Sequence, residues 1–252
     1  MYTSYVKTCN VLAVDDAAFD VFRSNGEVAR VVETLTRAQG EQYFRALDAT
    51  APFKAAIALD AIGHPTLFKY GSYTISPLML RYLHQIQLLV GYHGNALADK
   101  NIGDMNMADM NIIEVGGGFG GHASLLTKTH PVKSYTVIDL PSVAGLIQKY
   151  TTRAGANAVR VYPCTDNIWR NNKYDLFISH YCFSELDAAQ QDDYLPVIRA
   201  TPRGFMICNI INRKSHHKNK IIKWIQDAHP SLRILDEEPQ TYRGNYVLVW
   251  ND

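Results

Sequence analysis

A run of glycines behind a short apolar stretch is the strongest chemical signal in this chain. Residues 111–115 read Asn-Ile-Ile-Glu-Val, and residues 116–121 read Gly-Gly-Gly-Phe-Gly-Gly. An apolar run that ends abruptly in glycines indicates a buried strand that turns tightly into a helix. Because glycine has no Cβ atom, Gly116, Gly118 and Gly120 can adopt positive φ angles and let a ligand lie against the backbone, near the free N–H groups of the helix. The run therefore predicts a nucleotide site.

The glycine spacing fits two kinds of nucleotide site. The first, third and fifth residues of the run fit G-x-G-x-G, and the first, third and sixth fit the dinucleotide pattern G-x-G-x-x-G. A second β-rich run, residues 134–139, ends in Asp139, where a carboxylate can accept hydrogen bonds from both hydroxyls of a ribose. An acid in this place suits NAD as well, so the spacing leaves both alternatives open.

Glu114 helps to separate the two alternatives. It stands two positions before the first glycine, where an apolar side chain is easier to bury, so its carboxylate needs a partner. At this point the chain resembles the class I S-adenosylmethionine-dependent methyltransferases: residues 114–121 resemble that superfamily's first motif, and Ile-Asp-Leu at residues 138–140 its acidic second-strand motif. The resemblance spans roughly residues 105–252. It implies S-adenosylmethionine as the cofactor, with contacts from Glu114, Gly116, Gly117, Gly118, Gly120, Asp139 and Leu140.

A narrower resemblance rests on short motifs. Residues 114–121, residues 134–141 and the upstream Pro77-Leu-Met-Leu-Arg-Tyr82 are similar to the sugar O-methyltransferases. Ser76 and Pro77 are typical of a helix start, and Arg81 lies one turn further on. Arg81 either packs or forks onto the carboxylate of the cofactor.

Composition sets the class of protein and of partner. The chain has 252 residues, and its 25 basic residues nearly balance its 24 acidic ones, which favours neither a nucleic-acid nor a membrane partner. The four cysteines lack C-x-x-C spacing and indicate reduced thiols. No apolar run reaches the length of a membrane span, and the first residues lack a signal peptide's apolar stretch. We expect a cytoplasmic protein, and a homodimer is left open.

The order of the periodic segments predicts the fold. Residues 17–94 have helical spacing, and residues 95–109 have the composition of a linker, so we expect an all-helical N-terminal region over residues 1–104, on the substrate side, and a core over residues 105–252. Strands are predicted at 110–115, 134–139, 158–162, 174–179, 204–210, 232–236 and 244–250, and helices at 120–129, 141–154, 187–199 and 216–228.

This alternation predicts an α/β fold with a Rossmann-like, doubly wound, seven-stranded sheet that is mostly parallel. Residues 237–244 are too few for a crossover helix, so the last strand is predicted to be antiparallel, as the methyltransferase resemblance also implies. Ligands of such sheets bind beyond the carboxyl ends of the strands.

The third and fourth strand ends carry further candidates. Asp166 resembles the superfamily's acidic adenine contact and Asn167 follows it, with a turn beside a buried Trp169 as the equal alternative. Ser179, at the end of the fourth strand, is a further cofactor candidate. His180 follows it and is the candidate general base, because methyl transfer to a hydroxyl requires removal of a proton and imidazole has the side-chain pKa nearest neutrality.

Four residues are candidates for contact with the acceptor, and one carboxylate for a catalytic role beside His180. Glu185 would orient that imidazole or bind a sugar hydroxyl. Asn209 and Asn212 suit a polyhydroxylated acceptor, because an amide both donates and accepts hydrogen bonds. Tyr181 and His122 complete the set. Asp192 and Asp193, as helix neighbours, point in different directions, so we expect no catalytic metal.

The leading hypothesis is an S-adenosylmethionine-dependent O-methyltransferase whose acceptor is the hydroxyl of a small molecule, sugar or glycan, including a nucleotide- or lipid-linked sugar. One alternative is an NAD(P)-dependent oxidoreductase, although the chain has no Tyr-x-x-x-Lys pair for short-chain dehydrogenase chemistry. The other is a non-catalytic subunit that keeps the fold for binding or assembly.

Overall fold

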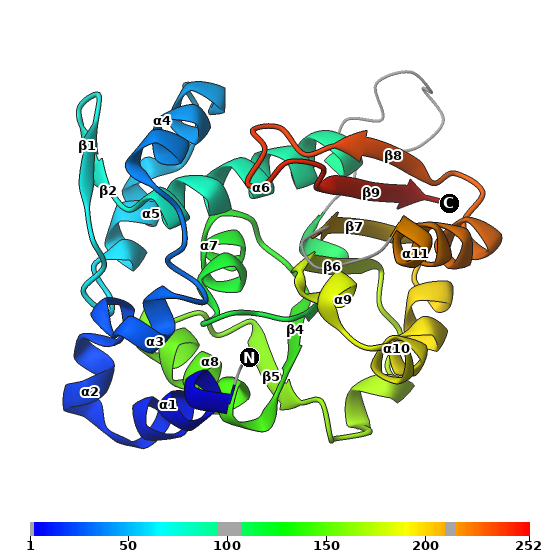
Figure 1. The fold of residues 1–252 in the computed structure, drawn as a ribbon, viewed down its shortest axis with the longest axis horizontal. Coiled ribbons are helices and arrows are strands. Elements are labelled where there is room, and N and C mark those ends of the chain that lie inside the picture. The colour runs from blue at the N-terminus through cyan, green and yellow to red at the C-terminus, as the bar shows by residue number, and fades with distance from the viewer. Residues whose placement is uncertain (1–2, 95–106, 210–214) are drawn as a thin grey trace.

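The computed structural model describes residues 3–94, 107–209 and 215–252, apart from the side chains of residues 94 and 215–219. Its centre is a seven-stranded sheet in the order β5-β4-β3-β6-β7-β9-β8 (Figure 1). The strands are β3 (Asn111–Val115), β4 (Ser134–Asp139), β5 (Val159–Pro163), β6 (Leu176–Tyr181), β7 (Arg203–Cys208), β8 (Arg233–Asp236) and β9 (Tyr246–Asn251). Neighbouring strands pair in parallel from β5 to β7, whereas β9 is antiparallel to both β7 and β8. The predicted Rossmann-like, doubly wound α/β fold with an antiparallel last strand is confirmed.

Helices follow most of the parallel strands. They are α7 (Gly121–Thr129), α8 (Pro141–Ala154), α9 (Cys182–Glu185), α10 (Ala188–Ala200) and α11 (Ser215–Ala228). The side chains of β3 alternate between two buried clusters: Ile112 packs with α7 and α8, and Ile113 packs with α10 and α11. The sheet is therefore covered on both faces, as its continuous apolar strands require.

The N-terminal region is not entirely helical. Its helices are α1 (Thr3–Val14), α2 (Asp16–Asp20), α3 (Gly26–Ala29), α4 (Arg37–Ala46), α5 (Phe53–Asp60) and α6 (Pro77–Gly94). Between α5 and α6 the chain forms a hairpin of β1 (Phe68–Tyr70) and β2 (Tyr73–Ile75), which corrects the all-helical prediction. Gly71, in the turn, has a φ of 56°, a conformation that glycine adopts without strain.

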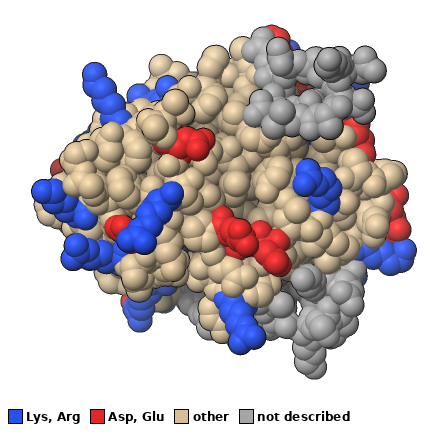
Figure 2. Space-filling view, turned by 90° about the horizontal axis from the view of Figure 1, so that it is seen from above, with Lys and Arg blue, Asp and Glu red and all other residues tan. Residues whose placement is uncertain are grey.

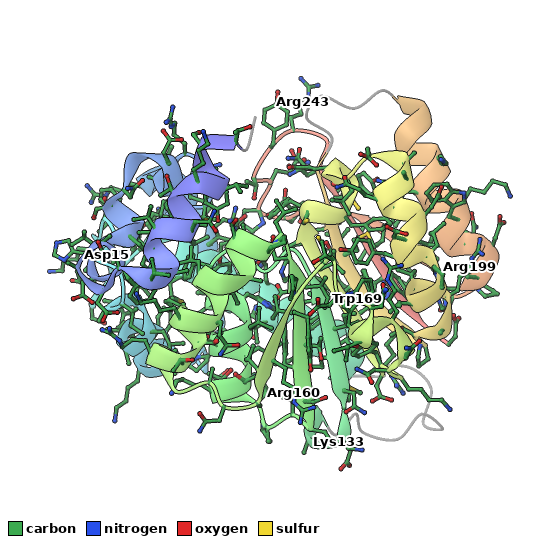
Figure 3. All side chains as sticks on the ribbon, turned by 90° about the horizontal axis from the view of Figure 1, so that it is seen from below. Asp15, Lys133, Arg160, Trp169, Arg199 and Arg243 are labelled. Carbon is green, nitrogen blue, oxygen red and sulfur yellow. The ribbon has the colours of Figure 1, made fainter. Side chains whose placement is uncertain are left out.

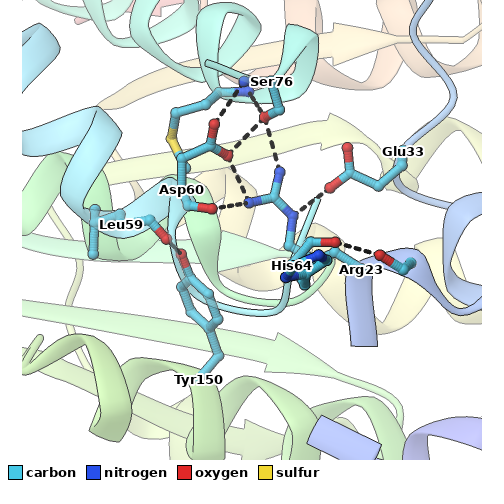
Figure 4. Close-up of polar contacts among 9 residues, drawn as sticks. Arg23, Glu33, Leu59, Asp60, His64, Ser76 and Tyr150 are labelled. Atoms are coloured by element: carbon cyan, nitrogen blue, oxygen red, sulfur yellow. Dashed lines mark hydrogen bonds and ion pairs between the residues drawn. The ribbon is translucent and has the colours of Figure 1, made fainter. Parts of the chain in front are cut away.

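A buried ionic network fixes the start of α6 (Figure 4). The guanidinium of Arg23 donates to Asp60 Oδ1 at 2.6 Å and to Ser76 Oγ at 2.9 Å, and its Nε is paired with Glu33. Ser76 Oγ accepts a hydrogen bond from the Met79 amide at 3.2 Å, which confirms the predicted N-terminal cap. Because α6 begins at this network, the network also sets the position of the side chains one or two turns along that helix.

The loop that follows β8 lies at the carboxyl edge of the sheet. Since Tyr246, at the start of β9, pairs with Cys208, at the end of β7, residues 237–245 lie beside that edge. In Figure 3, Arg243 in this loop lies on the opposite side of the molecule from Lys133 and Arg160, which lie near the amino ends of β4 and β5. Figure 2 shows one face on which acidic and basic side chains are scattered in small groups, in keeping with a net charge of +1. Among the described residues, none of the helices has the length and hydropathy of a membrane span.

Candidate functional site

A cavity of about 340 Å³ lies at the carboxyl ends of β3, β4 and β6. The N-terminal region closes one side of it through α1 and α6. Its lining includes eleven of the predicted site residues: Arg81, Glu114, Gly116, Gly117, Gly118, His122, Asp139, Leu140, His180, Tyr181 and Glu185. A more open hollow of about 990 Å³ lies beside α5, α7 and α8 and is lined by none of the predicted site residues.

The glycine loop forms one wall of the cavity as the sequence predicts. Gly116 and Gly118 have φ angles of 84° and 61°. A Cβ atom on Gly116 would lie 2.1 Å from the Cβ of Cys182, so no larger residue fits there without displacing the start of α9. The backbone between β3 and α7 is thus exposed to whatever the cavity binds.

Asp139 lies at the end of β4 and faces this loop. Its carboxylate accepts a hydrogen bond from the Leu140 amide at 2.8 Å, and the amides of Gly117 and Gly118 also donate to it. Burial nevertheless dominates and raises the pKa of Asp139 to about 7, because the charged form loses hydration. A ligand with hydroxyl groups would donate hydrogen bonds to the charged carboxylate and so replace the lost hydration.

Glu114, His122 and His180 also line the cavity and lie close to one another. The Oε1 atom of Glu114 lies 3.6 Å from the Nδ1 atoms of both histidines, and the two imidazole centroids are 4.3 Å apart. Burial lowers the pKa of each imidazole to about 3, and burial raises the pKa of Glu114. Both rings are therefore uncharged at neutral pH. The predicted carboxylate partner of His180 was Glu185, whereas the carboxylate found beside the ring belongs to Glu114.

Two side chains of α6 reach the cavity with unused polar atoms. Arg81 is 8% exposed, and its Nε has no hydrogen-bond partner among the described residues. Gln85, one turn later, is 2% exposed, and within the described part of the chain neither its Oε1 nor its Nε2 is hydrogen-bonded. Unsatisfied buried groups of this kind are costly, and here they face a cavity, so they point to a ligand with both donors and acceptors.

Tyr181 joins the cavity to the loop after β8. Its φ of 67° is unusual for a residue with a side chain. The ring lies beneath the guanidinium of Arg81, and the hydroxyl donates to Glu237 at 2.5 Å. Glu237 also accepts from the backbone amide of Thr241 and from Asn245, each at 2.9 Å. The loop is therefore tied to the strand end that carries His180.

Two of the remaining candidates, Glu185 and Asn209, are hydrogen-bonded to each other. Glu185 lines the cavity and accepts a hydrogen bond from Asn209 Nδ2 at 2.8 Å. The backbone amide of Asn209 donates to the hydroxyl oxygen of Ser184, also at 2.8 Å. Asn212 lies outside the described residues.

Four predicted cofactor residues do not line the cavity. Gly120, with a φ of 90°, precedes α7, and a Cβ there would lie 3.0 Å from side-chain atoms of α8. Ser179 is fully buried, and its hydroxyl donates to the Val115 carbonyl at 2.9 Å, which ties β6 to β3. Asp166 and Asn167 lie in the turn after β5 and away from the cavity lining. The neighbouring Trp169 is fully buried and stacks on Tyr194, so the turn with a buried tryptophan is the alternative that the structure supports.

Several lining residues were not predicted from the sequence. Tyr5 of α1 is 5% exposed, and the charge of Asp139 contributes to the raised pKa of its hydroxyl. Gln85 was one helical turn from Arg81, a spacing that could have indicated a shared face. The others are Val31, Val32, Val143, Cys182, Leu186 and Gln190, whereas Tyr82 belongs to the upstream motif already noted beside Arg81.

No family model matches this sequence, and no curated protein matches it. Among solved structures, the chain is similar to a SAM-dependent methyltransferase from Aquifex aeolicus, at 14% identity over 66% of this chain and 88% of that chain, with a TM-score of 0.49. It is also similar to an rRNA methylase from Streptococcus thermophilus, at 8% identity over 58% and 89% of the two chains, with a TM-score of 0.45. A precorrin-6y C5,15-methyltransferase from Geobacter metallireducens is similar at 10% identity over 58% and 82%, with a TM-score of 0.43. The fold described above stands on this chain's own strand pairing.

Proposed function

We propose that this chain is an S-adenosylmethionine-dependent methyltransferase. The observation that carries the proposal is that Asp139, the glycine loop, Arg81 and Glu114 all line one cavity, where they would bind a ribose diol and a zwitterion. Asp139 and the glycine loop form the first site. Arg81 and Glu114 supply one buried charge of each sign to the second. S-adenosylmethionine carries a ribose at one end and an α-amino acid at the other, so its two polar ends match the cavity.

The zwitterion site assigns a role to the unused polar atoms. The guanidinium of Arg81 would bind the cofactor's carboxylate, a charge-assisted contact that a planar fork makes well. The carboxylate of Glu114 would accept from the ammonium group, and the amide of Gln85 can serve either group. Arg81 and Glu114 therefore stay in the proposed set of cofactor contacts.

The same residues disfavour the oxidoreductase alternative. A dinucleotide places its pyrophosphate against the glycine loop, where it carries two negative charges. Glu114 lies in the same cavity wall and would repel that group. A cavity of about 340 Å³ also lies near the small end of the common range for ligand sites, about 300–1,000 Å³, whereas a dinucleotide contains two nucleotides.

We further propose that the methyl acceptor is a hydroxyl of a sugar or glycan. The support is the polar rim at the ends of β6 and β7, where Tyr181, Glu185 and Asn209 offer donors and acceptors. His180 would receive the hydroxyl proton, because an uncharged imidazole ring can accept one. A pKa of about 3 makes it a weak base, so Glu114, 3.6 Å from its Nδ1, is needed to stabilise the imidazolium. Alignment of the two substrates would supply much of the rate.

The division into an N-terminal region, residues 1–104, and a core, residues 105–252, is kept as part of this proposal. In it, α1 and α6 close the cavity over the cofactor by contributing Tyr5, Arg81 and Gln85. The acceptor would then enter from the side of the loop of residues 237–245.

The test is calorimetric titration of the full chain with S-adenosylhomocysteine and, separately, with NAD and NADP. We expect S-adenosylhomocysteine to bind saturably, and we expect neither NAD nor NADP to bind. Transfer of a labelled methyl group from S-adenosylmethionine to a panel of free, nucleotide-linked and lipid-linked sugars then tests the acceptor. Binding of NAD in preference to S-adenosylhomocysteine would overturn the methyltransferase proposal. Binding of S-adenosylhomocysteine without transfer to any hydroxyl in the panel would favour the non-catalytic alternative.

A further inference from the structure

Three side chains with metal-ligand chemistry converge at one end of the cavity. Glu114 ends β3, His122 lies in the first turn of α7 and His180 lies near the end of β6. Each offers one ligand atom, and the three atoms lie within 4.8 Å of one another. Two imidazoles and one carboxylate form a set that binds Zn²⁺, and Fe²⁺ as well, with positions left open for water. Small side-chain movements would bring the three ligand atoms to bonding distance.

The histidines lack partners for half of their nitrogen atoms. The Nε2 atoms of both His122 and His180 are buried and have no hydrogen-bond partner in residues 3–94, 107–209 and 215–252. The side chains of Glu114, His122 and His180 are only 2%, 2% and 7% exposed, so water does not readily replace the missing contacts. Two neutral imidazoles and a carboxylate that face one another present lone pairs and negative charge, which a cation satisfies better than a neutral ligand.

Tyr135 supplies the outer support that metal sites usually have. Its hydroxyl donates to Oε2 of Glu114 at 3.1 Å and lies 3.3 Å from Nδ1 of His122. A hydrogen bond to the second carboxylate oxygen fixes the orientation of the ligand and leaves Oε1 turned toward the histidines. Tyr135 is a fully buried strand residue, so the ligands of the site are held from the core and not by surface side chains.

We propose that Glu114, His122 and His180 bind a divalent transition metal of the zinc type in the cofactor-free protein, and that the metal and S-adenosylmethionine exclude each other. The exclusion rests on the proposed function, in which Glu114 binds the cofactor's ammonium group. Metal binding itself does not rest on it. The ion inhibits in this scheme, so His180 remains available as the base once the cofactor has displaced the metal.

Arg81 gives the proposal a second consequence. Its positive charge acts on His180 across the cavity, and therefore opposes a metal ion bound there. The same charge attracts the carboxylate of the cofactor. Replacement of Arg81 by methionine should therefore change the two affinities in opposite directions, tighter for the metal and weaker for S-adenosylhomocysteine.

The experiment is titration of the metal-free full chain with Zn²⁺ in competition with a chromogenic chelator. We expect one saturable site per chain in the parent, and loss of that site in His122→Gln and His180→Gln. Tyr135→Phe, which keeps the buried ring, should weaken the site about 10–100-fold, the usual effect of losing a partner of a metal ligand. His130→Gln is the matched control, since His130 ends the same helix α7 and bonds to Thr129 away from the cavity. Circular dichroism identifies any variant that has not folded.

The outcomes test metal binding and its exclusion by the cofactor separately. Absence of a saturable site in the parent, or parent-like binding by folded His122→Gln and His180→Gln, overturns the metal site. If the glutamine variants do not fold, parent-like binding by Tyr135→Phe overturns it instead. Repetition of the titration with saturating S-adenosylhomocysteine tests exclusion: we expect a large fall in Zn²⁺ affinity, and unchanged affinity overturns it. Failure of S-adenosylhomocysteine to bind at all would count against the proposed function and leave the metal site standing.

Discussion

The guanidinium of Arg81 lies 5.2 Å from the centroid of the Tyr181 ring, and both side chains line the cavity. An aromatic face is a favourable neighbour for a cation, but it leaves the hydrogen-bond donors of the guanidinium unused. Within the part of the chain that the structure describes, no ion pair joins Arg81 to a carboxylate. Glu237, whose charge acts on Arg81, already accepts four hydrogen bonds. Arg81 is thus a buried cation that Tyr181 holds in place and whose guanidinium donors could bind an anion.

Replacement of this anion-binding group should weaken the cofactor site. Arg81→Met keeps much of the side-chain volume and removes the charge, so binding of S-adenosylhomocysteine should fall by about 1.5–3 kcal/mol, the scale of a hydrogen bond to a charged group. Calorimetry measures the change. Arg45→Met, at an exposed position on α4, is the control and should bind like the parent. Equal affinity of Arg81→Met and the parent would remove Arg81 from the contact set.

Asp139 should carry the ribose end of the same ligand. Asp139→Ala removes both acceptor oxygens, so we expect a loss of about 1.5–3 kcal/mol in S-adenosylhomocysteine binding. Asp175→Ala provides a control, because Asp175 bonds Asn111 at the amino end of β3, away from the cavity. If adenosine analogues without ribose hydroxyls bind the parent as well as S-adenosylhomocysteine does, the diol contact is absent.

The raised pKa of Asp139 adds a pH dependence of definite sign. Burial raises this pKa from the usual 3.8 to about 7, and only the ionised carboxylate accepts from both hydroxyls. Affinity for S-adenosylhomocysteine should therefore rise with pH up to and through 7 and then level off. In the ligand-free protein the contribution of Asp139 to stability is fully present below pH 3.8 and is lost as the pH rises through about 7. Titration calorimetry from pH 5.5 to 8.5 measures the affinity of the parent and of Asp139→Asn, and scanning calorimetry measures their stability. A parent affinity that does not change with pH would contradict the ribose contact of Asp139.

The sheet and the glycine loop were predictable because their signals are local. Continuous apolar runs, glycines at the first turn and an acid at the end of the second strand are properties of short segments, and each has one structural solution in an α/β fold. The hairpin of residues 68–75 was also readable, since Phe-Lys-Tyr and Tyr-Thr-Ile alternate around Gly71 and Ser72. It was missed within a long stretch of helical spacing.

The convergence of Glu114, His122 and His180 was not predictable from spacing. It depends on β6 lying beside β3, which brings residues 66 positions apart in the chain onto adjacent strand ends, and on the rotation of α7. The same reasoning explains Glu185. It is close to His180 in sequence, but the chain turns at Tyr181 into α9 and directs Glu185 to Asn209. Proximity in the sequence therefore favours Glu185 as the partner of His180, whereas the order of the strands brings Glu114 beside its ring.

The Arg23 network offers a test of how the N-terminal region is held. Asp60 is 2% exposed and depends on Arg23 and Ser76 for its partners. Arg23→Met leaves that carboxylate buried without a cation, so we expect the free energy of unfolding to fall by about 3–5 kcal/mol, as when one partner of a buried ion pair is removed. Urea denaturation measures it, with exposed Arg45→Met as the control. Addition of Asp60→Asn should restore part of the loss. A loss no larger than that of the control would show that the network contributes little.

The role of His180 can be separated from its neighbours by comparing binding with turnover. His180→Ala removes the ring proposed to accept the hydroxyl proton but leaves Arg81, Asp139 and the glycine loop intact. We expect S-adenosylhomocysteine to bind almost as well as to the parent, while methyl transfer falls by about 10²–10⁴-fold, the range for loss of a general base. His130→Ala, at the far end of α7, should transfer methyl groups like the parent. Parent turnover should survive EDTA, since the metal proposed for this cluster inhibits. Near-normal transfer by His180→Ala, or loss of parent activity on chelation, would reassign the proton transfer, and Glu185 and His122 would then be the next residues to replace.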